Sequence, residues 1–129
     1  MVRFAKNPTA MNMIHFINYD HVTLTYPYGQ ESVLRKFYGD VLGLEEIIGN
    51  HPNESIWFKM GNKEIHFVVE QMGPLSRRHV AFEVQDLNHA KEYLHGQGIE
   101  ITFSSKIEGR DRFFVRDPFG NRLEFLVYD

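Results

Sequence analysis

The 129-residue chain contains no cysteine. A disulfide framework, a thiolate metal site and a cysteine nucleophile are therefore all excluded. A chain without cysteine also fits a reducing compartment, and we expect the protein to be cytoplasmic. Two other common catalytic motifs, the Gly-rich phosphate loop and the nucleophile elbow around a serine, are missing as well.

The chain also lacks a large net charge, which is -3 when the histidines are neutral. A partner nucleic acid or an anionic membrane surface is therefore not expected. No apolar run is long enough for a membrane span, and the first residues hold no sustained apolar region of the signal-peptide kind. We interpret residues 1–17 as a poorly patterned leader, within which Met11 is an alternative natural start.

What the chain does contain is a repeated order of strands and helices over residues 18–129, a length suited to one domain. Alternating residues predict strands and helically spaced apolar residues predict helices. In the first unit (18–71) we expect strands at 18–26, 44–48, 55–60 and 64–70, and a helix at 32–42. In the second unit (77–129) we expect strands at 79–84 and 99–103, a helix at 87–97, and a final hairpin over 112–128. Each unit is therefore β-α-β-β-β.

The two units also match in their residues, which indicates an internal duplication. HVTL at 21–24 corresponds to HVAF at 79–82, and GNKEIHF at 61–67 resembles GNRLEF at 120–125. The offset from His21 to His79 is 58 residues, and the offset from His66 to Glu124 is the same.

Four polar side chains occupy two equivalent positions of this repeat, His21 with His79 and His66 with Glu124. Each lies on the first or last strand of its unit, in the phase opposite the apolar row. If the helices cover the apolar face, all four point to the other, concave face. A mid-strand carboxylate is costly to desolvate unless it is paired or bound to a metal. Three imidazoles and one carboxylate suit Zn, Ni, Co, Mn or Fe, and the alternative is four unrelated half-buried polar residues.

The remaining candidates are more simply explained as structural or surface residues. The other histidines, expected at the surface, are His15, His51, His89 and His95. Trp57 fits a core position or a pocket wall equally well. The second half is rich in arginines, of which one or two at a pocket rim would hold an anionic substrate group: Arg77, Arg78, Arg110, Arg112, Arg116 and Arg122.

Several segments resemble the vicinal oxygen chelate superfamily, which includes glyoxalase I, fosfomycin thiol transferases, bleomycin-binding resistance proteins and extradiol dioxygenases. The segments are DHVTLTY, FYGDVLGLEE, EIHF, HVAFEVQDL and FFVRDPFGNRLEF, and the resemblance covers about residues 18–129. It implies an α+β fold in which two βαβββ modules form a curled eight-stranded mixed sheet around one divalent metal ion. It also implies a homodimer, with the site either inside one chain or shared between two.

By position, the resemblance makes His21, His79 and Glu124 the three ligands common to the metal-binding branches. His66 matches the fourth position, which is glutamate in glyoxalase I and is not a ligand in the fosfomycin enzymes. A dioxygenase needs open metal positions, one of which His66 would fill. A glyoxalase-like enzyme is therefore favoured over a fosfomycin thiol transferase or a dioxygenase.

The function that these residues imply is that of a metal-dependent lyase or isomerase, acting on a small substrate with vicinal oxygens. The metal would stabilise an enediolate, and Glu124 would move the proton. Glu83 and Glu70 are rival bases, because each shares the inner phase of a ligand strand. The alternative is a non-catalytic protein that sequesters an antibiotic or a metabolite in the same concave pocket.

Overall fold

The computed structural model describes residues 14–129, so residues 1–13 of the predicted leader lie outside the described part of the chain. The first sheet has the order β1-β4-β3-β2. Its strands are β1 (His21–Tyr26), β2 (Glu46–Ile47), β3 (Ile56–Met60) and β4 (Lys63–Val69). β1 pairs with β4 in parallel, and the other pairs are antiparallel. β1 is therefore an edge strand of this sheet.

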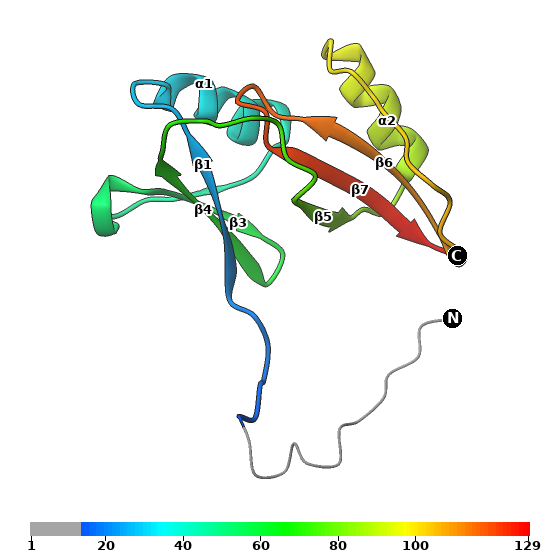
Figure 1. The fold of residues 1–129 in the computed structure, drawn as a ribbon, viewed down its shortest axis with the longest axis horizontal. Coiled ribbons are helices and arrows are strands. Elements are labelled where there is room, and N and C mark those ends of the chain that lie inside the picture. Colours follow the sequence, from blue (N-terminus) through cyan, green and yellow to red (C-terminus); the bar gives the residue numbers. More distant parts are fainter. Residues whose placement is uncertain (1–13) are drawn as a thin grey trace.

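The second sheet repeats this arrangement with the order β5-β7-β6. Its strands are β5 (His79–Glu83), β6 (Arg110–Arg116) and β7 (Arg122–Tyr128). β5 is parallel to β7, as β1 is to β4. In Figure 1 the two sheets lie side by side, with α1 near the top of β1 and α2 beside β6.

One predicted strand is almost absent, so residues 14–129 form seven strands in two sheets that do not close. The segment predicted at 99–103 makes only one bridge, between Thr102 and Phe114. The amide of Ile99 instead donates to Leu94 and completes the end of the preceding helix. Phe103 is 68% exposed, because the chain has already left the sheet edge there.

The helices follow the predicted positions with one difference in type. α2 (Leu87–Gly96) begins as expected at Asp86, whose carboxylate accepts a hydrogen bond from the amide of His89. The first helix is α-helical only over α1 (Glu31–Arg35) and continues as a π-helical segment, η2 (Lys36–Val41). A 3-10 turn, η3 (Pro52–Glu54), precedes β3. None of the helices in residues 14–129 is long and apolar enough to cross a membrane.

One hydrophobic core joins the two halves, and it includes Leu34, Phe67, Phe82 and Leu123. A buried polar contact crosses this core, in which the hydroxyl of Tyr38 donates to Asp117 Oδ2 at 2.6 Å. The α+β architecture of two related units is thus confirmed, and their apolar faces share a common interior.

The turn between β6 and β7 ties the second half to the first. Asp117 Oδ1 accepts from the amides of Phe119 and Asn121, each at 2.9 Å. The side-chain amide of Asn121 donates to Asp117 Oδ2 and to the backbone carbonyl of Thr25 near the end of β1. Gly120 has φ of +97°, and a Cβ there would lie 2.8 Å from Leu75. The DPFGN segment is therefore a hydrogen-bonded turn that connects β6 to β7 and binds to the end of β1.

Candidate metal centre

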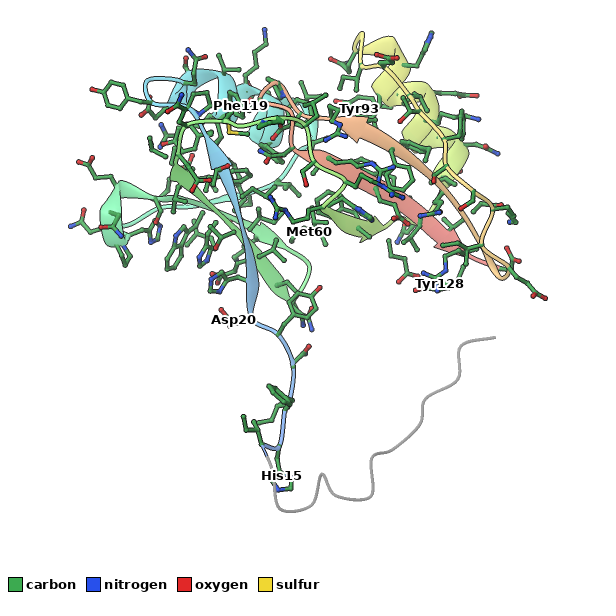
Figure 2. The ribbon with its side chains drawn as sticks, viewed as in Figure 1. His15, Asp20, Met60, Tyr93, Phe119 and Tyr128 are labelled. Carbon is green, nitrogen blue, oxygen red and sulfur yellow. The ribbon has the colours of Figure 1, made fainter. Side chains whose placement is uncertain are left out.

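The first half-site consists of His21 on β1 and His66 on β4, whose stacked rings have centroids 3.8 Å apart. The His66 side chain is 9% exposed, whereas the His21 side chain is 38% exposed. Asp20 Oδ2, at the start of β1 in Figure 2, lies 2.9 Å from His21 Nδ1. Because a carboxylate only accepts, Nδ1 donates to Asp20, and Nε2 is the ring nitrogen left for a metal ion. His21 is thus prepared as an Nε2 ligand by a carboxylate on its other nitrogen.

A column of four stacked rings supports this half-site. The indole of Trp57 lies 3.8 Å from the His66 ring at an angle of 2°, and His51 stacks on its other face at 3.9 Å. Trp57 Nε1 donates to Ser55 Oγ, and His51 Nε2 lies 2.7 Å from the carbonyl of Ile47. Trp57 is therefore packed between His66 and His51, and His51, which was expected at the surface, is half-buried against the indole.

Glu64 is a member of this half-site that the sequence analysis missed. Its Oε1 lies 2.8 Å from His66 Nε2, and Glu64 is the cross-strand partner of His21. The available signal was its position two residues before His66, which places both on the same face of β4. Ligation through Nε2 of His66 requires Glu64 to move aside or to become an additional oxygen donor.

The second half-site consists of His79 on β5 and Glu124 on β7. Glu124 is 4% exposed, and its Oε1 lies 2.8 Å from His79 Nε2. His79 Nδ1 lies 2.9 Å from the carbonyl of Arg77, which only accepts, so Nδ1 carries a proton. The lone pair of Nε2 then faces a carboxylate oxygen, an arrangement that needs a cation between the two atoms, either a proton or a metal ion. This pair fits one nitrogen and one oxygen ligand of a divalent ion.

Arginines surround the second half-site. The sequence alone did not indicate which of the six arginines in the second half of the chain would lie there. Arg112 Nη1 lies 3.4 Å from Glu124 Oε1, the same oxygen that faces His79. Arg112 and Arg122 both lie over the ring of Phe114, with their guanidinium carbons 5.1 and 3.7 Å from its centroid. Desolvation lowers the pKa of Arg122, as does the repulsion of neighbouring arginines. The second half-site is therefore strongly cationic around one carboxylate.

The four predicted ligands come together as two pairs. His21 and His66 lie on the first sheet, and His79 and Glu124 lie on the second. Within residues 14–129 of one chain, no group of three or more His, Cys, Asp or Glu side chains is arranged to hold a metal ion. The first strand of each unit pairs with its last strand, while the convergence of all four residues on one ion stays a prediction. The two rival bases, Glu70 and Glu83, are exposed, and so are His15, His89 and His95.

A cleft of about 610 Å³ adjoins the second half-site, where the edge strand of each sheet is exposed. Thr23 and Thr25 of β1 line one side, and His79 of β5 and Arg122 of β7 line the other. The segment 70–76 closes the cleft between them. The cleft therefore reaches His79 of the second half-site.

Comparisons with known proteins show which family and which fold this chain resembles. A family model described as Glyoxalase/Bleomycin resistance protein/Dioxygenase superfamily matches residues 18–125. The crystal structure of a putative glyoxalase family protein from Bacillus anthracis has 41% identity and a TM-score of 0.82, covering 91% of this chain and 100% of that chain. No curated protein matches the sequence.

Two more distant structures show the same fold. The lactoylglutathione lyase from Agrobacterium tumefaciens has 20% identity and a TM-score of 0.68, covering 85% of this chain and 92% of that chain. The genomically encoded fosfomycin resistance protein from Listeria monocytogenes has 16% identity and a TM-score of 0.70, covering 89% of this chain and 94% of that chain. At these identities the likeness concerns the fold alone.

Proposed function

This chain belongs to the Glyoxalase/Bleomycin resistance protein/Dioxygenase superfamily, and we propose that it is a metal-dependent lyase or isomerase of the glyoxalase type. Its substrate is a small molecule with vicinal oxygens. The observation that carries the proposal is the pair of half-sites, one with two imidazoles and one with an imidazole facing a buried carboxylate at 2.8 Å. Buried or stacked ligands of this kind suit a borderline divalent ion such as Zn, Ni, Co, Mn or Fe.

The complete centre in this proposal is shared by two copies of the chain in a homodimer. In this assembly the first half-site of one copy faces the second half-site of the other copy, which brings four ligands together. A twofold axis then forms two equivalent centres at once. Support for an assembly comes from the open edges of β1 and β5 and from exposed apolar side chains such as Ile48 and Leu75, at 82% and 72% exposure.

The chain's own residues would divide the chemical work. A bound divalent ion supplies a Lewis acid for the two substrate oxygens. Glu124 is the proton carrier, because it is the only carboxylate among the four ligands and its second oxygen is not tied to His79. An imidazole that binds a metal has committed its lone pair and cannot take a proton from carbon. Arg112 Nη1 lies 3.4 Å from Glu124 Oε1 and forms an ion pair with this carboxylate.

A second candidate function is that of a non-catalytic binding protein. The cleft of about 610 Å³ is large enough for a small drug or metabolite, and its walls are formed within one chain. Such a protein would bind its ligand without a metal ion. A measurement of the metal content of the protein therefore distinguishes the two functions.

Metal analysis of the purified full-length protein, together with assays on adducts of dicarbonyls and thiols, tests the proposal. We expect about one divalent ion per chain, and turnover that a chelator removes and the metal restores. His79→Ala should lose the metal, while His89→Ala, a change at an exposed helix histidine, should keep it. A protein that binds small molecules tightly without metal or turnover would instead be the binding protein.

A further inference from the structure

Arginine dominates one face of the second sheet. The face opposite the buried core residues Phe113, Val115, Leu123 and Phe125 carries eight side chains from β6 and β7. Four of them are arginines and only one is a carboxylate: Arg110, Arg112, Phe114, Arg116, Arg122, Glu124, Leu126 and Tyr128. This excess of positive over negative charge along the face favours the binding of an anion there.

These arginines are not used alike. Arg116 Nη1 donates to the carbonyls of Ser76 and Gly120 at 2.7 and 2.9 Å, so it holds two loops together. Arg112 donates to the carbonyl of Ser105 at 2.9 Å and reaches Glu124. Both guanidinium groups therefore already have a structural role.

Arg122 is different, because its donors are largely unused. Its one hydrogen bond to another of residues 14–129 is a long contact of 3.4 Å from Nη1 to the carbonyl of Arg77. No carboxylate in the same part of the chain forms an ion pair with it. Its guanidinium carbon lies 3.7 Å from the centroid of the buried Phe114 ring, which holds the group in place. A guanidinium fixed in this way is preorganised for a bidentate oxyanion.

The position of Arg122 connects it to the proposed reaction. It is the cross-strand partner of His79, and adjacent strands lie about 4.8 Å apart. Arg122 also precedes Glu124 by two residues on the same face of β7. Arg122 and His79 line the same cleft of about 610 Å³. A ligand held by Arg122 therefore has its next atoms beside the second half-site.

We infer that Arg122 anchors an oxyanion group of the substrate, a carboxylate or a phosphate. The substrate class becomes a small vicinal-oxygen compound that carries such a group next to its reacting carbon. The catalytic consequence rests on the proposed function, whereas binding of the anion needs neither the metal nor a second half-site. Arg122 is in this view a substrate-binding residue.

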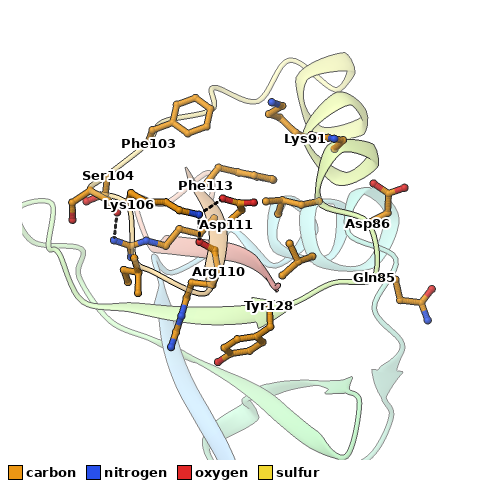
Figure 3. A pocket seen from close by; sticks show the side chains of 16 residues that line it. Gln85, Asp86, Lys91, Phe103, Ser104, Lys106, Arg110, Asp111, Phe113 and Tyr128 are labelled. Atoms are coloured by element: carbon orange, nitrogen blue, oxygen red, sulfur yellow. Dashed lines mark hydrogen bonds and ion pairs between the residues drawn. The ribbon is translucent and has the colours of Figure 1, made fainter. Parts of the chain in front are cut away.

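The test compares Arg122→Gln with a matched change, Arg110→Gln, in the full chain. Arg110 lies on the same face and over an aromatic ring, with its guanidinium carbon 4.8 Å from the centroid of Tyr128. It lines a different cavity, in which Figure 3 shows Arg110 and Tyr128 close together. Arg110 and Arg122 are six positions apart along the paired strands, about 20 Å. Both changes remove one positive charge from one sheet face.

Acetate and inorganic phosphate serve as probes, titrated at constant ionic strength and followed by the Nε–Hε resonances of arginine in NMR spectra. We expect at least one probe to bind the parent and shift the Arg122 resonance. Arg122→Gln should weaken that binding by about tenfold or more, the loss expected for charge-assisted hydrogen bonds. Arg110→Gln should change it less than about twofold, since its charge is distant and screened. Equal losses in both variants, or binding of neither probe to the parent, would overturn the inference.

Kinetics separate this inference from the proposed function. With an active substrate, Arg122→Gln should raise KM by about tenfold or more and change kcat far less, because the lost contact holds a group that does not itself react. An unchanged KM in an active variant refutes the anchor and leaves the enzyme assignment intact. Anion binding that depends on Arg122 in a parent without any turnover refutes the enzyme assignment and leaves the anchor intact.

Discussion

Replacing Tyr38 with phenylalanine removes a hydroxyl that links the first half of the molecule to the buried turn before β7. Tyr38 is fully buried, and its hydroxyl donates at 2.6 Å to Asp117, which is 4% exposed. The carboxylate keeps three other donors, the amides of Phe119 and Asn121 and the side chain of Asn121. The fold therefore survives, but Asp117 loses one of its four hydrogen bonds inside the core.

The expected loss of stability follows from the charge and burial of the acceptor. A hydrogen bond to a buried charged group contributes about 1.5–3 kcal/mol. In a domain of this size such a loss lowers Tm by about 5–12 °C. Tyr93→Phe is the matched control, because its hydroxyl also donates at 2.6 Å, to the carbonyl of Val41, but the residue is 41% exposed. Water replaces that bond, so we expect a loss below about 1 kcal/mol.

Urea unfolding of the parent and the two variants measures both free energies. The pH dependence gives an independent check, because burial, followed by the charge of Asp117, raises the pKa of Tyr38 well above its usual value. A pKa raised in the folded state means that the contribution of Tyr38 is complete below about pH 10 and is lost as pH rises through the folded-state pKa. The gap between the parent and Tyr38→Phe should therefore narrow at high pH. Equal losses of stability in the Tyr38 and Tyr93 variants would refute this reasoning.

Two further predictions concern the metal centre. Glu124→Gln should keep much of the metal and lower turnover about 10²- to 10⁴-fold, the usual contribution of a general base; normal turnover with metal bound would move that role to Glu83 or Glu70. Trp57, the only tryptophan of the chain, stacks at 3.8 Å on His66, so adding Ni or Co to chelated protein should quench its fluorescence. His66→Ala should abolish most of that quenching, and full quenching in the variant would show that the ion binds elsewhere.

The strands and their faces could be predicted because alternation in a strand is a local property. Val22 and Leu24 against His21, and Leu123 and Phe125 against Glu124, place each polar residue on the face away from the core. The structure confirms that phase for all four predicted ligands. The same local rule found α2, whose cap and apolar stripe both lie within a few residues.

The sequence could not show that the predicted strand at 99–103 is almost absent, because strand formation there depends on pairing with a distant part of the chain. Residues 99–103 alternate well, yet only Thr102 reaches a partner strand. The π-helical segment η2 is a similar case, in which the amide of Leu42 donates to Phe37 rather than to the residue four positions back. Neither difference affects the half-sites, because both segments lie outside the strands that carry them.

The side chains that contact the four predicted metal ligands were the least predictable part of the site. Arg112 meets Glu124 across neighbouring strands, and only the register of β6 against β7 decides which of several arginines comes close. Glu64 had a usable signal in its spacing from His66, but the Trp57 stack depends on the path of β3 beside β4. Whether the half-sites meet in one chain or between two is a property of assembly, which alternation along one sequence does not specify.

The central claim is that one centre takes a half-site from each of two chains, and mixing inactive variants tests it most directly. One variant carries His21→Ala with His66→Ala, and the other carries His79→Ala with Glu124→Ala, so neither alone should bind the metal tightly. After unfolding and refolding an equal mixture, half of the dimers contain both variants, and each such dimer has one intact centre. The account predicts recovery of about a quarter of the parent's tightly bound metal, as random twofold pairing requires. No recovery, in a mixture shown by mass spectrometry to contain the mixed dimers, would contradict a centre shared between chains.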